Sequence, residues 1–159
     1  MSDSFRFFVG IDLGSASHQV CVLDASGQTL GERAVAHSGA DVAALLVWLT
    51  TLTQAADPPS IAVAAEVPHG ALVEAFLERG YAVFAINPKQ LDRFRDRFSV
   101  AGAKDDRRDA LVLAHALRTD RYAFRPLALR DPRLLRLREL GRAEESLQQD
   151  LRRAANQLW

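Results

Sequence analysis

Alternating blocks of apolar and polar residues predict an α/β arrangement for most of the chain. Apolar or alternating runs predict five strands, at residues 5–13, 18–24, 29–37, 61–65 and 81–86. Stretches with helical spacing or helix start and stop signals predict helices from Ser38 or Asp41 to about residue 56, and at residues 70–79, 89–98 and 105–119. A last, long helix begins at Asp131-Pro132 and continues to residue 159.

The order of these elements predicts a topology. Three strands joined by short turns pair antiparallel, two strand–helix crossovers follow, and the first strand then pairs with the fourth. Asp12 closes the first strand and Glu66 closes the fourth, so both carboxylates should lie where open α/β sheets build their sites. We therefore predict a ribonuclease-H-like (RuvC-like) α/β fold, with a five-stranded mixed sheet, flanking helices and a long C-terminal helical arm.

Four acidic residues are the candidate catalytic and metal-binding groups. A carboxylate at the end of a buried strand loses hydration unless it has a partner, and this applies to Asp12 and Glu66. Asp106 and Asp109 lie three residues apart and should share one face of a helix. Oxygen ligands in this arrangement suit Mg²⁺ or Mn²⁺ better than zinc, and two-metal phosphoryl transfer is the chemistry they most often serve. Each acid alone could be structural; the four together favour a metal site.

The two halves of the chain differ in charge, although the net charge is zero. Residues 1–86 contain three Arg and nine Asp or Glu, a balance of −6, whereas residues 87–159 contain 17 Lys or Arg and 11 Asp or Glu, a balance of +6. This asymmetry indicates a polyanion as partner of the second half. The candidate nucleic-acid-binding residues are Lys89, Arg93, Arg95, Arg97, Lys104, Arg107 and Arg108. For the interleaved Phe94 and Phe98 we expect a place in the core.

Composition also limits the cellular setting. The single cysteine, Cys21, excludes an internal disulfide framework, fits a reducing compartment and is expected to be a buried apolar residue. The longest uncharged stretch, residues 42–56, is shorter than the roughly 20 residues that span a bilayer. No secretory signal pattern is present, because Asp12 interrupts the apolar N-terminal run. We expect a cytoplasmic protein without a membrane partner.

Several motifs together resemble a known family. They are Val9-Gly10-Ile11-Asp12, Glu66 with Gly70 after it, Asn87-Pro88, and the segment Lys104 to Ala110, which carries Asp106 and Asp109. The chain resembles the N-terminal DEDD domain of insertion-sequence transposases related to the Piv/MooV DNA invertases. The family pattern Lys-Thr-Asp-x-x-Asp-Ala has threonine where this chain has Asp105, so Asp105 is a possible rival of Asp106 as a metal ligand.

The resemblance implies a RuvC-like domain in which the four acids bind magnesium and help to cut and rejoin DNA. Family members are about twice as long and carry a nucleophilic serine in a second domain, which we expect to be missing here, leaving this fragment alone inactive. Relatives use a structured guide RNA, so RNA is a possible partner besides DNA. We expect a catalytic domain at 1–125 and the start of a helical arm at 126–159. Apolar residues along that arm predict a coiled coil that joins copies of the chain, namely Leu137, Leu140, Leu147, Leu151, Ala154 and Leu158.

Other readings of the sequence stay open. Sugar kinases and actin-like ATPases share the Gly-Ile-Asp-Leu-Gly strand end but need further glycine-rich phosphate loops, and residues 15–159 contain none. A Holliday-junction resolvase of the same fold, with water as nucleophile, is the nearest enzymatic alternative. A non-catalytic module that binds nucleic acid and dimerises is the alternative from another class.

Overall fold

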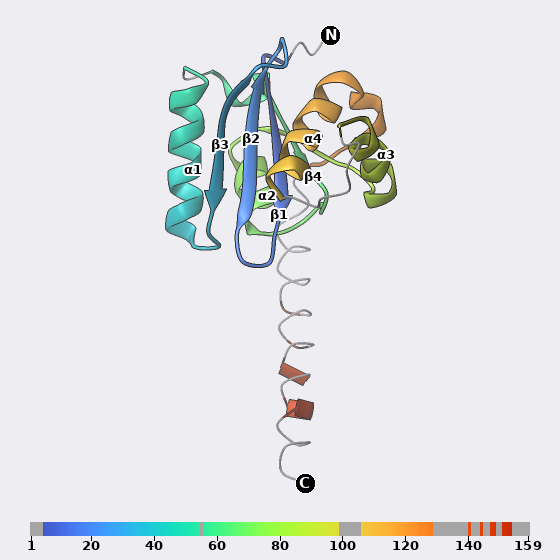
Figure 1. Ribbon diagram of the computed structural model, residues 1–159. Helices are drawn as coiled ribbons and strands as arrows, with labels where there is room; N and C mark the ends of the chain where they lie inside the picture. Colours follow the sequence, from blue (N-terminus) through green and yellow to red (C-terminus); the bar gives the residue numbers. More distant parts are fainter. Residues whose placement is uncertain are drawn as a thin grey trace. The chain divides into compact units, whose positions relative to one another are not determined.

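The computed structural model describes residues 5–54, 56–98 and 106–128, together with residues 140, 144, 147, 148 and 151–153 (Figure 1). The chain divides into two compact units, Met1–Ala128 and Leu129–Trp159. In the second unit the described residues are helical and exposed, among them Leu140, Leu147 and Leu151. The other residues of the predicted coiled-coil seam, Leu137, Ala154 and Leu158, lie outside the described residues, as do Lys104 and Asp105.

A mixed sheet forms the centre of the first unit. Its strands are β1 (Phe7–Leu13), β2 (His18–Asp24), β3 (Thr29–Val35), β4 (Ile61–Ala65), β5 (Ala82–Ala85) and β6 (Arg125–Pro126). They lie in the order β3-β2-β1-β4-β5-β6. The β1–β2 and β2–β3 pairs are antiparallel, whereas β1–β4 and β4–β5 are parallel. The pairing of the first strand with the fourth is the one that the order of elements predicts.

The sheet has one strand more than the five predicted. β6 lies between the predicted helices at 105–119 and 131–159, where the sequence predicts neither strand nor helix, and pairs antiparallel with β5. Its two residues are both exposed, so no alternation of apolar and polar positions marks it. Pro126 can occupy it because proline is tolerated at the edge of a sheet, and the Leu127 amide extends the pairing by donating to Val83 O at 2.8 Å.

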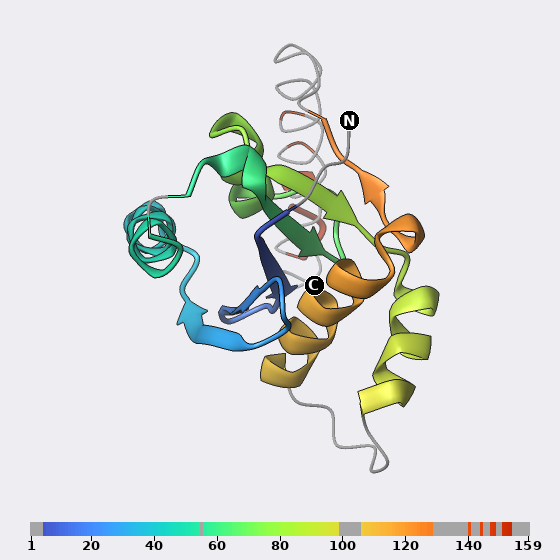
Figure 2. The same cartoon turned by 90° about the horizontal axis from the view of Figure 1, so that it is seen from above.

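Helices cover both faces of the sheet (Figures 1 and 2). α1 (Gly39–Leu52) and α2 (Ala71–Glu78) pack on one face, where Leu45, Leu49 and Phe76 share a core with Val9 and Val63. α3 (Pro88–Phe98) and α4 (Asp106–Thr119) cover the other face. The fully apolar β4 is buried along its whole length, as expected for a central parallel strand with helices on both sides.

Local signals explain the helix boundaries. The Ser38 hydroxyl accepts from the Asp41 amide at 3.1 Å, so Ser38 is the N-cap of α1 and Asp41 lies in its first turn. α1 ends at Leu52, before the predicted end near residue 56, and Gln54 adopts the left-handed conformation with φ 53°. Among the described residues no helix is long and apolar enough to cross a membrane.

Candidate functional site

The ends of β1 and β4 place two of the four candidate acids at one edge of the sheet. The strands are parallel neighbours, and Ile11 lies opposite Ala65. Asp12 and Glu66 each follow one of these paired residues and are half-buried. Both carboxylates therefore start from the carboxyl end of the sheet, as the sequence predicts.

A glycine allows α4 to cross β1 closely enough to bring a third acid to this edge. A Cβ atom at Gly10 would lie 1.9 Å from the Ala110 carbonyl oxygen and 2.6 Å from the Ala114 amide nitrogen. Only glycine accommodates that approach, because both opposing atoms belong to the helix backbone. Ala110 directly follows Asp109, so the close contact at Gly10 fixes the height of Asp109 above the sheet.

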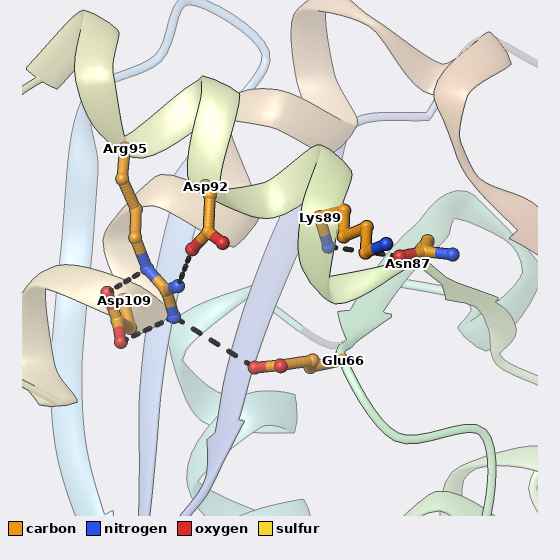
Figure 3. A network of polar contacts seen from close by, with 6 residues as sticks. All are labelled: Glu66, Asn87, Lys89, Asp92, Arg95 and Asp109. Carbon is orange, nitrogen blue, oxygen red and sulfur yellow. Dashed lines mark hydrogen bonds and ion pairs between the residues drawn. The ribbon is translucent and has the colours of Figure 1, made fainter.

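Arg95 of α3 connects acids from three elements (Figure 3). Its Nε and Nη2 atoms donate to the two carboxylate oxygens of Asp109, each at 2.8 Å. Its Nη1 atom donates to Asp92, three residues earlier in the same helix. The Nη2 atom also lies 4.0 Å from Oε2 of Glu66. One guanidinium thus holds Asp109 in a two-bond contact and lies within ion-pair distance of Glu66.

Burial makes the contact with Asp109 stronger than a surface ion pair. The Asp109 side chain is 6% exposed, compared with 28% for Arg95 and 26% for Glu66. A buried carboxylate needs a partner for its charge, and parallel N–H···O bonds from a guanidinium are the strongest that a side chain offers. The hydrogen bonds to Asp109, with a smaller contribution from Asp92, raise the pKa of the Arg95 guanidinium above its usual range.

The residues around Arg95 fit a hard divalent cation. Glu66 and Asp109 approach the same nitrogen from different elements, so a positive charge already lies between their oxygens. Carboxylate oxygens are the ligands that Mg²⁺ and Mn²⁺ prefer. Within the described ranges no three His, Cys, Asp or Glu residues form a group that could hold a metal ion. The site therefore contains two convergent carboxylates around a guanidinium.

The other two candidate acids are Asp12 and Asp106. Asp12 lies beside Glu66 at the strand ends and pairs across the sheet with Gln19 of β2. Asp106 is the first residue of α4 and precedes Asp109 by one turn, and its side chain lies outside the described part of the chain. The structure thus places Asp12, Glu66 and Asp109 near the carboxyl ends of β1 and β4, and side-chain contacts connect Glu66 and Asp109 through Arg95.

The predicted nucleic-acid-binding residues fall into two groups. Arg97 and Arg107 form ion pairs with Asp120 (3.1 Å) and Glu32, respectively, and Arg95 binds the site acids. Lys89 and Arg93 on α3 and Arg108 on α4 are exposed. Phe94 is buried against the sheet, as expected, and the Phe98 side chain lies outside the described part of the chain.

Sequence reasoning did not identify the link between Arg95 and the acids. It assigned Arg95 to nucleic acid as one of several α3 arginines, because no local pattern connects Arg95 with Glu66 or Asp109. The Asp92–Arg95 spacing of three residues was an available signal for a local ion pair. Asp120 was also missed. It is 8% exposed, and it accepts hydrogen bonds from Thr119 (2.6 Å), Tyr122 (2.9 Å) and Arg97 (3.1 Å).

Comparisons with known proteins agree with the sequence resemblance. The sequence profile of the IS110-type DEDD transposase family, described as "Transposase", matches residues 9–159. The chain is 48% identical over its full length to "Putative transposase y4uE" of Sinorhizobium fredii and covers 45% of that protein. It is 37% identical over 98% of its length to "Mini-circle putative transposase for IS117" of Streptomyces coelicolor and covers 37% of that protein. The chain therefore spans less than half of either relative.

The fold is also found in a solved structure. A RuvC from T. thermophilus, solved in complex with a Holliday junction substrate, matches with a TM-score of 0.52 and 18% sequence identity. The match covers 76% of this chain and 99% of the RuvC chain. It confirms the predicted RuvC-like fold.

Proposed function

The chain belongs to the IS110-type family of DEDD transposases, and we propose that it forms the cation-binding part of an enzyme that cuts and transfers DNA strands. The observation that carries the proposal is the convergence of Glu66 and Asp109 on one cationic nitrogen. It occurs beside Asp12, at the sheet edge where α/β folds build their sites.

The four acids supply the ligands. Asp12 and Glu66 would hold Mg²⁺ or Mn²⁺ from the two strand ends, and Asp106 and Asp109 from the first turn of α4, with Asp105 as a rival to Asp106. Bound ions of this kind orient the scissile phosphate, activate the attacking oxygen and stabilise the leaving one. The chain's own part is to fix its ligands, and the tight crossing of α4 at Gly10 does so for Asp109.

DNA is the proposed substrate, and the exposed basic residues are the proposed contacts. Lys89, Arg93 and Arg108 are exposed and are the proposed contacts to phosphate groups, whose attraction supplies most of the sequence-independent affinity. Arg97 and Arg107 are exposed as well and form ion pairs with Asp120 and Glu32, with which a phosphate group would compete. A structured guide RNA and assembly through the C-terminal helix stay predictions from the sequence.

The complete reaction needs more than the residues of this chain. We propose that residues 1–125 form the catalytic domain and 126–159 begin a helical arm, with the nucleophilic serine in a further domain of the enzyme. Both relatives named above are more than twice as long as the segment that they share with this chain. The isolated chain should then bind cations and DNA without completing strand transfer.

A transposition assay tests the proposal. The chain replaces the matching 45% of the Sinorhizobium fredii relative, and movement of a marked element is counted in cells. If the chimaera moves the element, the Asp109→Asn change should reduce the transposition frequency to background. The matched control, Asp96→Asn, changes an exposed aspartate of α3 and should keep full activity. Equal transposition by Asp109→Asn and the parent chimaera would refute the proposal. Cleavage of a four-way junction by the chain alone, lost in Asp109→Asn, would instead indicate a resolvase.

A further inference from the structure

Arg95 lies between the carboxylates of Glu66 and Asp109, two of the proposed cation ligands. The Nη2 atom is shared between the two carboxylates, at 2.8 Å from Asp109 and 4.0 Å from Glu66 (Figure 3). A cation bound by both acids would have to take the same oxygens of Asp109 that Nε and Nη2 now use. Arg95 and the cation therefore compete for these ligands.

We propose that Arg95 is a positioning residue that holds the catalytic carboxylates together in the absence of a cation and is exchanged for the cation when it binds. This inference rests on the proposed function, because it assigns the same acids as ligands. In the cation-free chain the guanidinium offsets the repulsion between Glu66 and Asp109. It also keeps the largely buried Asp109 in a fixed orientation.

The hydrogen bonds of Arg95 are divided in a way that permits the exchange. Nε and Nη2 bind Asp109, whereas Nη1 binds Asp92 on the same helix. The Asp92 side chain is 67% exposed, and Asp92 is not one of the candidate cation ligands. When the cation takes Asp109, the guanidinium can keep Asp92 as its partner and stay at the edge of the site. Nε and Nη2 then become free donors, a pair suited to a phosphate oxygen.

Exchange and a purely structural role of Arg95 predict opposite effects of its removal on cation affinity. If Arg95 only supports the fold, its removal should weaken cation binding. If Arg95 competes with the cation, its removal should tighten binding, because the cation no longer displaces two charge-assisted hydrogen bonds. We expect Arg95→Gln to bind Mn²⁺ about tenfold more tightly than the wild type, which corresponds to about 1.4 kcal/mol.

Calorimetric titration of the 159-residue chain with Mn²⁺ tests the inference. The matched control is Arg125→Gln, which removes the same charge from an exposed position of β6, outside the proposed contacts, and should leave the affinity within about twofold. Thermal unfolding in EDTA is the second readout. Arg95→Gln should unfold at a lower temperature than Arg125→Gln without cation, and the difference should shrink or reverse when Mn²⁺ is added.

The possible results separate this inference from the proposed function. If the wild type binds Mn²⁺ and Arg95→Gln binds it equally well or more weakly, the exchange is overturned and the proposed cation site stands. Failure of both the wild type and Arg95→Gln to bind Mn²⁺ overturns the inference and the proposed cation site together. If Arg95→Gln does not fold, Arg95→Lys serves in its place. Lysine loses the two-bond contact with Asp109, so tighter binding than the wild type supports the exchange and unchanged or weaker binding refutes it.

Discussion

Replacement of Gly10 by alanine tests how the fold positions Asp109. The added Cβ would lie 1.9 Å from the Ala110 carbonyl oxygen, and Cβ contacts in proteins essentially never fall below 3.0 Å. Helix α4 would have to retreat by about 1 Å or more to remove this clash. Both opposing atoms belong to the backbone, so no side-chain rotation can relieve it. Overpacking of this kind costs about 3 kcal/mol.

Urea unfolding measures that cost. With a dependence of about 2 kcal/mol per molar urea, a loss of about 3 kcal/mol lowers the midpoint by about 1.5 M. The matched control is Gly39→Ala, at the first position of α1, where a Cβ meets no atom within 4 Å. Alanine there should leave the midpoint unchanged or raise it slightly, because it favours helix.

The same variant tests the connection between the helix crossing and cation binding. A retreat of about 1 Å carries Asp109 away from Glu66, whereas metal ligation tolerates only about 0.2 Å. In the absence of urea, where the Gly10→Ala variant is still folded, we expect it to bind Mn²⁺ more weakly than the wild type. An unchanged urea midpoint together with unchanged affinity would refute the idea that the contact at Gly10 sets the height of α4.

Two further predictions concern buried polar groups elsewhere in the fold. Hydrogen bonds from Thr119, Tyr122 and Arg97 lower the pKa of Asp120, so its stabilising contribution is complete above its unfolded pKa of about 3.9 and disappears as the pH falls through the lower folded value. Asp120→Asn should therefore cost about 1–2 kcal/mol in urea unfolding at pH 7 and less at pH 3; a deficit that is equal at both pH values would contradict this account. Burial raises the pKa of the Cys21 thiol to about 12, so iodoacetamide at pH 8 should label Cys21 only after unfolding, as mass spectrometry can show, and rapid labelling of the folded chain would be the contrary result.

The sequence predicted the structure correctly where a residue pattern is compatible with only one local structure or strand pairing. The apolar run of β4 has to be buried on both faces, and its place after three hairpin-linked strands leaves β1 as its natural partner. The strand ends of Asp12 and Glu66 follow from that pairing. The Ser38 cap is likewise a local signal that the structure contains.

The remaining features depend on contacts between residues far apart in the chain. The role of Gly10 can be recognised only from the structure, where α4 crosses β1 at this residue. In the sequence it is simply a glycine within a strand. Arg93 and Arg95 look alike in sequence, and only the packing of α3 beside α4 directs Arg95 to Asp109. β6 has two exposed residues and no periodicity, so only its hydrogen bonds with β5 identify it as a strand.

The central claim is that Glu66 and Asp109 belong to one divalent cation site. Titration of the 159-residue chain with Mn²⁺, compared among wild type, Asp109→Asn and the exposed control Asp96→Asn, tests it most directly. We predict that the wild type and Asp96→Asn bind alike, and that Asp109→Asn binds at least about tenfold more weakly because the cation loses a charged ligand. Equal Mn²⁺ affinity of Asp109→Asn and the wild type would contradict the account.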